Sequence, residues 1–121
     1  MGISSEGGDL LKRLMSATAL RRDVLANNIA SQNLPGYRRR EVQFEELLAT
    51  ALEKGERPKD LDRIEAKVVA DWDTPGRADG NNVSAEEEAS LMTENRIRFE
   101  VYAMLLRGRN SLISQAINGD R

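Results

Sequence analysis

The sequence predicts a mainly α-helical fold: long N- and C-terminal helices pack as a coiled-coil-like pair, with a small irregular and β central segment. Apolar residues recur at helical spacing near both ends, and turn residues cluster between them. Aromatic residues make up only 4% of the chain, whereas charged residues make up 31%. Because large aromatic side chains dominate compact cores, the Leu, Ala, Ile and Val of this chain favour helices that bury one stripe against a partner.

The 121 residues fit one ordinary domain. Segment 1–8 is small and polar and is expected to be flexible, which leaves a single domain over 9–121. Asp9 can cap an N-terminal helix over 9–33. Because Leu34 precedes a proline and is disfavoured in the α region, the helix should end there. Its apolar face consists of Leu10, Leu14, Ala17, Leu20, Val24 and Ile29.

The central segment, 34–83, is predicted to be mixed. Residues 34–37 form a type II turn, because Pro35 presets φ at the second position and Gly36 supplies positive φ at the third. The stripe that follows favours a short helix, with Val42 either extending it or ending a short strand. Apolar and charged residues then alternate from Ile64 to Trp72, which favours a strand. The stripe of the short helix is Phe44, Leu47, Leu48 and Ala51.

The C-terminal helix, over 84–118, gives the clearest signal. Ser84 and Glu87 match a capping box, and the acidic residues 86–88 lie where the helix dipole favours negative charge. Beyond them an apolar seam repeats every seven residues, as in a coiled coil, and Asn118-Gly119 ends it. Tyr102 lies on the flank of this seam. The seam consists of Met92, Phe99, Leu106 and Ile113.

The composition argues against most common enzyme chemistries. The formal net charge is -2, and the chain has no Cys and no His. It therefore lacks a thiol nucleophile, a Cys-based zinc site and the usual proton shuttle. The acidic cluster 86–88 has no neighbouring base or metal set and is interpreted as helix capping. We expect no catalysis, cofactor, metal or small-molecule substrate.

Two further signals favour ordinary surface roles. Asp71, Asp73 and the residues up to Asn82 resemble a calcium loop, but the EF-hand spacing fails. The arginine pair 21–22 and triplet 38–40 could contact phosphates, but neighbouring glutamates balance them and no aromatic platform accompanies them. We expect these arginines to form inter-subunit ion pairs or to be solvated, and we expect no nucleic-acid binding.

The most specific motif spans residues 26–38, ANNIASQNLPGYR. It resembles the N-terminal signature of bacterial flagellar rod and hook proteins, A-N-N-I-A-N-x-N-T-P-G-Y-[KR]. Ser31 stands where that family has Asn, and Leu34 stands where it has Thr. Both departures lie at the end of the helix and leave the turn itself in place.

A second motif, DGNNV at 79–83, resembles the element that opens the C-terminal helix in the proximal-rod type of this family. Glu88-Ala89-Ser90-Leu91 and the residues to Asn95 are similar to that type's E-x-x-x-L-x-x-N. The resemblance covers both ends of the chain and leaves the middle least constrained. It favours the proximal rod over the longer distal rod and hook proteins.

The resemblance implies a structural subunit of the flagellar basal-body rod that self-assembles through its terminal helices into a torque-transmitting shaft needed for swimming. It implies homo-oligomers and other rod subunits as partners, together with export-gate and basal-body ring proteins. The implied location is the periplasmic span of the basal body, reached by flagellar type III export. Residues 1–8 lack a basic n-region and an apolar core, so no cleaved signal peptide is expected.

Two alternatives remain: a soluble helical adaptor or chaperone, and another axial rod subunit of the same family. On the rod interpretation the terminal helices and the two motifs carry assembly. The N-terminal residues expected at the interface are Leu10, Leu14, Ala17, Val24, Asn27, Asn28, Ile29, Asn33, Pro35, Gly36 and Tyr37. The C-terminal ones are Asn81, Asn82, Val83, Met92, Asn95, Phe99, Tyr102, Leu106 and Ile113.

Overall fold

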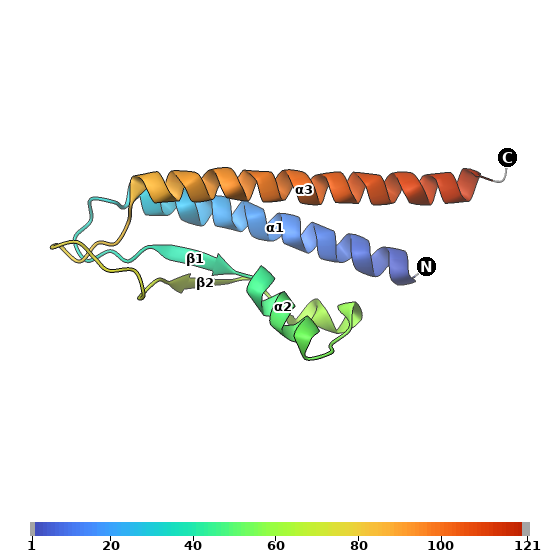
Figure 1. Ribbon diagram of the computed structural model, residues 1–121, viewed down its shortest axis with the longest axis horizontal. Helices are drawn as coiled ribbons and strands as arrows, with labels where there is room; N and C mark the ends of the chain where they lie inside the picture. Colours follow the sequence, from blue (N-terminus) through green and yellow to red (C-terminus); the bar gives the residue numbers. More distant parts are fainter. Residues whose placement is uncertain (1, 120–121) are drawn as a thin grey trace.

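The computed structural model describes residues 2–119 of the chain. Two long helices, α1 (Gly2–Ala30) and α3 (Ala85–Asn118), pack side by side and run in opposite directions. The chain between them lies along one side of this pair (Figure 1). The predicted class, a pair of long terminal helices with a small β-containing middle, is confirmed. The connecting elements are β1 (Arg40–Gln43), α2 (Glu45–Glu53), the 3-10 helix η1 (Pro58–Arg63) and β2 (Lys67–Ala70).

The bounds of α1 differ from the prediction. The helix begins at Gly2 instead of Asp9, so Asp9 lies within it and does not cap it. Gly7 lies close to α3, because a Cβ there would stand 2.7 Å from the Arg109 guanidinium. The longer α3 thus offers this segment a surface on which to continue the helix. The flexibility expected for residues 1–8 stays a prediction. Met1 and residues 120–121, which belong to the predicted N-terminal segment and the predicted domain, lie outside the described residues.

The predicted turn after α1 is confirmed. Tyr37 N donates to Leu34 O at 3.2 Å, and Gly36 has φ of 75°. Gly36 N also donates to Asp79 O at 2.7 Å, which joins this turn to the loop before α3. The chain therefore leaves α1 in a fixed direction, toward β1.

The two strands form an antiparallel hairpin in which Arg40 pairs with Ala70 and Gln43 with Lys67. The strand expected from Ile64 to Trp72 is shorter, because Ile64 N donates to Leu61 O at 3.0 Å and closes η1. Ile64 therefore packs into the core beside Leu61 and lies outside the strand. Among residues 2–119, no helix is long and apolar enough to cross a membrane.

The apolar core lies between α1, α2 and η1, beside the helix pair. Leu10, Leu14 and Ala17 of α1 pack into this core, although the sequence analysis expected them to meet α3. The reason is that α1 is covered on two sides, and its most apolar side faces the connecting elements. The buried members of the core are Ala17, Phe44, Leu48, Ala51, Leu61 and Ile64.

Truncating this core should cost much more than truncating the surface. Leu61 is 0% exposed, so Leu61→Ala should lower the free energy of unfolding by about 3 kcal/mol, through lost transfer energy and a residual cavity. Leu52 is 49% exposed, so the matched Leu52→Ala change should stay within about 0.5 kcal/mol. Urea unfolding followed by circular dichroism measures both. Equal losses would contradict this placement of the core.

Candidate functional site

The two sequence motifs meet in space. Motif 26–38 ends α1 and begins the connecting chain, and motif 79–83 leads into α3, so both lie where the helix pair is closed by loops (Figure 1). We call the contact between them the motif junction. Its side chains are asparagines, a tyrosine and buried ions, and its bonds tie segments that are far apart in the sequence.

Asn28 is the centre of the first motif. Its side chain is fully buried, and its amide nitrogen donates to Arg40 O at 2.8 Å and to Glu88 Oε2 at 3.0 Å. Its amide oxygen accepts from Arg40 N at 2.9 Å and from the Tyr37 hydroxyl at 3.0 Å. One amide therefore joins α1, β1 and α3, and its buried polar atoms are satisfied.

Asn81 joins the second motif to the end of α1 by hydrogen bonds. Its amide nitrogen donates to Ser31 O at 3.0 Å and to Leu34 O at 2.8 Å. Its amide oxygen accepts from Val83 N at 2.8 Å. Ser31 and Leu34 are the two departures from the rod signature, and both contribute backbone carbonyls here. Any residue type provides these acceptors, so the departures leave the junction intact.

Asn82 joins the same motif to the hairpin by hydrogen bonds. Its amide oxygen accepts from Arg39 N at 2.6 Å, and its amide nitrogen donates to Asp71 O at 2.9 Å and Thr74 O at 3.2 Å. The consecutive asparagines thus bond to different partners, Asn81 to the end of α1 and Asn82 to Arg39 and the loop after β2. Together they fix the position from which α3 starts.

Arg39 lies at the centre of a buried ion cluster. Its Nε is 2.5 Å from Glu88 Oε1, and its Nη1 is 3.1 Å from Asp71 Oδ2 and 3.2 Å from Glu41 Oε2. Burial opposes the charge of this guanidinium, but the hydrogen bond and the charge of Glu88, followed by Asp71 and Glu41, raise the pKa of Arg39 above its ordinary value. The cluster joins β1 and the loop after β2 to the first turn of α3.

Asp71 is held as an anion by its own loop. The Thr74 hydroxyl donates to Asp71 Oδ2 at 2.7 Å, and the backbone N–H groups of Thr74 and Asp73 donate to Oδ1 at 3.0 and 2.9 Å. The Thr74 hydroxyl, these backbone groups and Arg39 lower the pKa of Asp71 to about 2, against the effect of burial. The acidic stretch read as a possible calcium loop therefore has one carboxylate committed to an internal network.

Two predictions from the sequence are wrong: Glu88 is not a helix cap, and Arg39 is not a solvated or inter-subunit cation, because the two side chains pair within the chain. Ser84 Oγ does accept from Glu87 N, at 3.4 Å, so the predicted cap exists without Glu88. Glu88 is 0% exposed and Arg39 is 7% exposed. A signal was available: counting back in sevens from Tyr102 and Asn95 reaches Glu88, so this residue shares the face that turns toward α1.

Polar layers continue along the helix pair. Asn95 Nδ2 donates to Thr18 O at 2.8 Å, and Arg21 Nη1 donates to Asn95 Oδ1 at 3.2 Å. Arg21 also pairs with Glu45 at 2.5 Å, and the Tyr102 hydroxyl donates to the same carboxylate at 3.4 Å. Arg21 lowers the pKa of Glu45 against the effect of burial, while burial and the Glu45 charge raise the pKa of Tyr102.

The seam of α3 therefore has two kinds of layer. Its apolar positions alternate with polar ones at the steps of four and three residues typical of a coiled coil. Polar residues at such positions specify register at a cost in stability. The apolar layers are Met92, Phe99, Leu106 and Ile113, and the polar layers are Glu88, Asn95, Tyr102 and Arg109.

The structure divides the expected interface residues by burial. The buried ones face other parts of the same chain, and the exposed ones are accessible to solvent. Buried are Ala17, Asn28, Asn81, Asn82, Val83 and Asn95; half-buried are Leu10, Leu14, Val24, Ile29, Tyr37, Met92, Tyr102, Leu106 and Ile113. Exposed are Asn27, Asn33, Pro35, Gly36 and Phe99.

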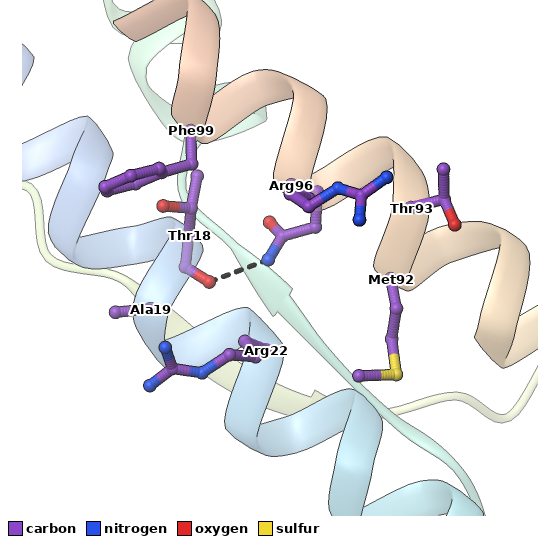
Figure 2. Close-up of a pocket in the computed structure, with 8 residues that line it drawn as sticks. Thr18, Ala19, Arg22, Met92, Thr93, Arg96 and Phe99 are labelled. Atoms are coloured by element: carbon purple, nitrogen blue, oxygen red, sulfur yellow. Dashed lines mark hydrogen bonds between the residues drawn. The ribbon is translucent and has the colours of Figure 1, made fainter. Parts of the chain in front are cut away.

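An open groove of about 330 Å³ lies between α1 and α3. Figure 2 shows Met92 and Phe99 reaching from α3 toward Ala19 and Arg22 of α1. Asn95 and Thr18, which also line the groove, are joined by the hydrogen bond from Asn95 Nδ2 to Thr18 O. Three expected interface residues, Met92, Asn95 and Phe99, thus line a surface that the rest of the described chain leaves open.

The fold and the motif junction define a helical-hairpin protein whose polar side chains are used to fix its own architecture. No family model matches the chain. Proteins named flagellar basal body rod protein FlgB are similar to it across most of its length. The relative from Bacillus subtilis (strain 168) is 24% identical over 119 residues, which cover 92% of each chain. The relative from Aquifex aeolicus (strain VF5) is 27% identical over 116 residues, which cover 93% of this chain and 94% of the relative.

A third relative of the same name, from Borrelia hermsii, is 27% identical over 120 residues, covering 84% of this chain and 88% of the relative. These matches agree with the identification made from the two motifs. The chain is therefore similar to flagellar rod proteins of the FlgB family over most of its length.

The buried ion pair should be essential for stability. Glu88→Gln leaves Arg39 without its nearest counter-charge and should lower the free energy of unfolding by about 3 kcal/mol. The matched control Glu87→Gln alters an exposed side chain one residue away and should change it by about 0.5 kcal/mol or less. Urea unfolding at neutral pH compares the two. Equal effects would show that burial of Glu88 does not matter.

The lowered pKa of Asp71 predicts an acid dependence of stability. Because the folded pKa of about 2 lies below the ordinary 3.8, its contribution is present above pH 3.8 and is lost as the pH falls toward 2. Asp71→Asn should remove about 2 kcal/mol at neutral pH and flatten the fall between those values. Thermal unfolding at a series of pH values measures this. The exposed control Asp73→Asn should keep the wild-type profile, and an unchanged profile in Asp71→Asn would contradict the assignment.

Proposed function

We propose that this chain is a structural subunit of the flagellar basal-body rod, of the proximal type, and has no catalytic role. It self-assembles through its terminal helices into the shaft that transmits torque to the hook and filament, and it is needed for swimming. The observation that carries the proposal is the motif junction. The two segments that resemble the rod signatures, 26–38 and 79–83, bond directly to each other and set the direction of α3.

The long helix pair has a shape suited to a subunit of a rigid shaft. An α-helix rises about 1.5 Å per residue, so the 34 residues of α3 make a long, straight element. The hydrogen bonds of the motif junction hold the helix pair together at one end. The polar layers between α1 and α3 fix the register of the two helices along their length. Surfaces remain for neighbours, among them the groove beside Phe99 and the exposed turn at Pro35.

The proposed partners are copies of this chain, other rod subunits, and export-gate and basal-body ring proteins. The proposed location is the periplasmic span of the flagellar basal body, reached through the flagellar type III system without a cleaved signal peptide. The names of the relatives, each a flagellar basal body rod protein, support a place in the flagellar basal body over the role of a soluble adaptor or chaperone. The shared name FlgB also supports the proximal subunit over another axial protein.

Deletion of the gene in its native host tests the proposal. We expect loss of swimming and absence of rods in basal bodies viewed by electron microscopy, because no other subunit supplies this layer of the shaft. The intact gene supplied in trans should restore both. Normal rods and normal swimming in the deletion strain would refute the rod function and favour the adaptor alternative.

A further inference from the structure

Helix α3 carries a second apolar stripe that α1 does not cover. Its large side chains are between 45% and 68% exposed, and at about 100° per residue they extend from the side opposite the seam, at Ile97, Val101 and Met104, to its flank, at Leu105 and Leu112. Contiguous exposed apolar surface of this kind marks an interaction site. We call it the outer stripe; it consists of Ile97, Val101, Met104, Leu105 and Leu112.

The residue spacing of the outer stripe is the same whether it is counted from its N-terminal end or from its C-terminal end. From Ile97 the apolar positions advance by four and three residues to Met104, and from Leu112 they return by four and three to Leu105. The position that matches Val101 in this pattern is Gly108. A Cβ at Gly108 would meet nothing within 4 Å, so the glycine leaves an open recess on the helix surface.

This symmetry fits a second copy of the same helix in antiparallel orientation. Ile97 then lies against Leu112 of the second copy, Met104 against Leu105, and Val101 over the recess at Gly108. Because the same patch is used on both copies, the contact is isologous and closes after two chains.

Charge favours the antiparallel orientation. The glutamates of α3 are residues 86, 87, 88, 94 and 100, and the only charged residues from 101 to 118 are Arg107 and Arg109. Antiparallel docking sets Glu100 beside Arg107 of the second copy, and symmetry makes this contact twice. Parallel docking would set each charge beside its own copy, and like charges at a rim select against a partner.

We infer that the outer stripe of α3 docks a second copy of this chain, antiparallel, to form a two-fold dimer of the free subunit. A closed dimer is finite, whereas a shaft grows through head-to-tail contacts that do not close. The dimer is therefore a state of the subunit outside the rod. The inference does not depend on the proposed rod function, and its test uses the purified chain alone.

Disulfide trapping tests the orientation, since the chain has no cysteine of its own. Ile97→Cys and Leu112→Cys variants, one carrying a mass tag, are purified separately, mixed and oxidised. We expect a mixed disulfide between the two variants and little cross-linking of either variant alone. Same-position cross-links would indicate parallel neighbours, and a mixture without disulfides would show that the stripe does not pair. Either result would overturn the inference.

Sedimentation equilibrium tests the contacts. Glu100→Arg should weaken self-association about tenfold, because two symmetry-related attractions become repulsions, and adding Arg107→Glu should restore it. Gly108→Gln fills the recess and should leave a monomer, while circular dichroism shows the helix retained because that space is empty within the chain. A monomeric wild type, or a Gly108→Gln variant that associates as wild type does, would overturn the proposed packing.

Discussion

The buried ion pair between Arg39 and Glu88 is the constraint on which the rest of the structure depends. Glu88 also accepts from Asn28, so this one carboxylate joins α1 and the residue just before β1 to α3 at the place where the helix pair closes. A buried charge that loses its partner is strongly unfavourable, so the three elements must come together with their ions matched. The asparagines of the motif junction then satisfy the backbone groups left exposed around the pair. Positions read from the sequence as a rod signature are thus the positions that complete this polar centre.

Stability and specificity are assigned to different parts of the molecule. The apolar core between α1, α2 and η1 supplies most of the hydrophobic burial, and it lies to one side of the helix pair. Between α1 and α3, polar layers such as Asn95 with Thr18 alternate with apolar ones and contribute register more than burial. The pair is consequently well defined in direction and position while retaining apolar surface, in the groove and on the outer stripe, for contacts beyond the chain.

Local patterns in the sequence were sufficient to predict that two long terminal helices exist, the Pro35-Gly36 turn and the cap at Ser84, because each depends on residues a few positions apart; they did not predict that α1 begins at Gly2. They were insufficient for the ion cluster, since nothing near Glu88 in the sequence indicates that Arg39 will lie beside it. The assignment of Leu10 and Leu14 to the α3 contact failed for a related reason. Periodicity shows that a helix has an apolar face, but it does not show which of two neighbours covers that face. The motif resemblance singled out Asn28, Asn81 and Asn82 as assembly residues, and it gave no indication that they bond within one chain.

The arrangement of the polar layers has a mechanical consequence. A force that pulls the open ends of α1 and α3 apart loads one layer at a time, as in unzipping, and each step breaks only a few bonds. A force along the helix axes loads the successive layers and the junction together, as in shear, and the whole set must fail at once. The helix pair is therefore far more resistant to axial load than to lateral peeling from its open end.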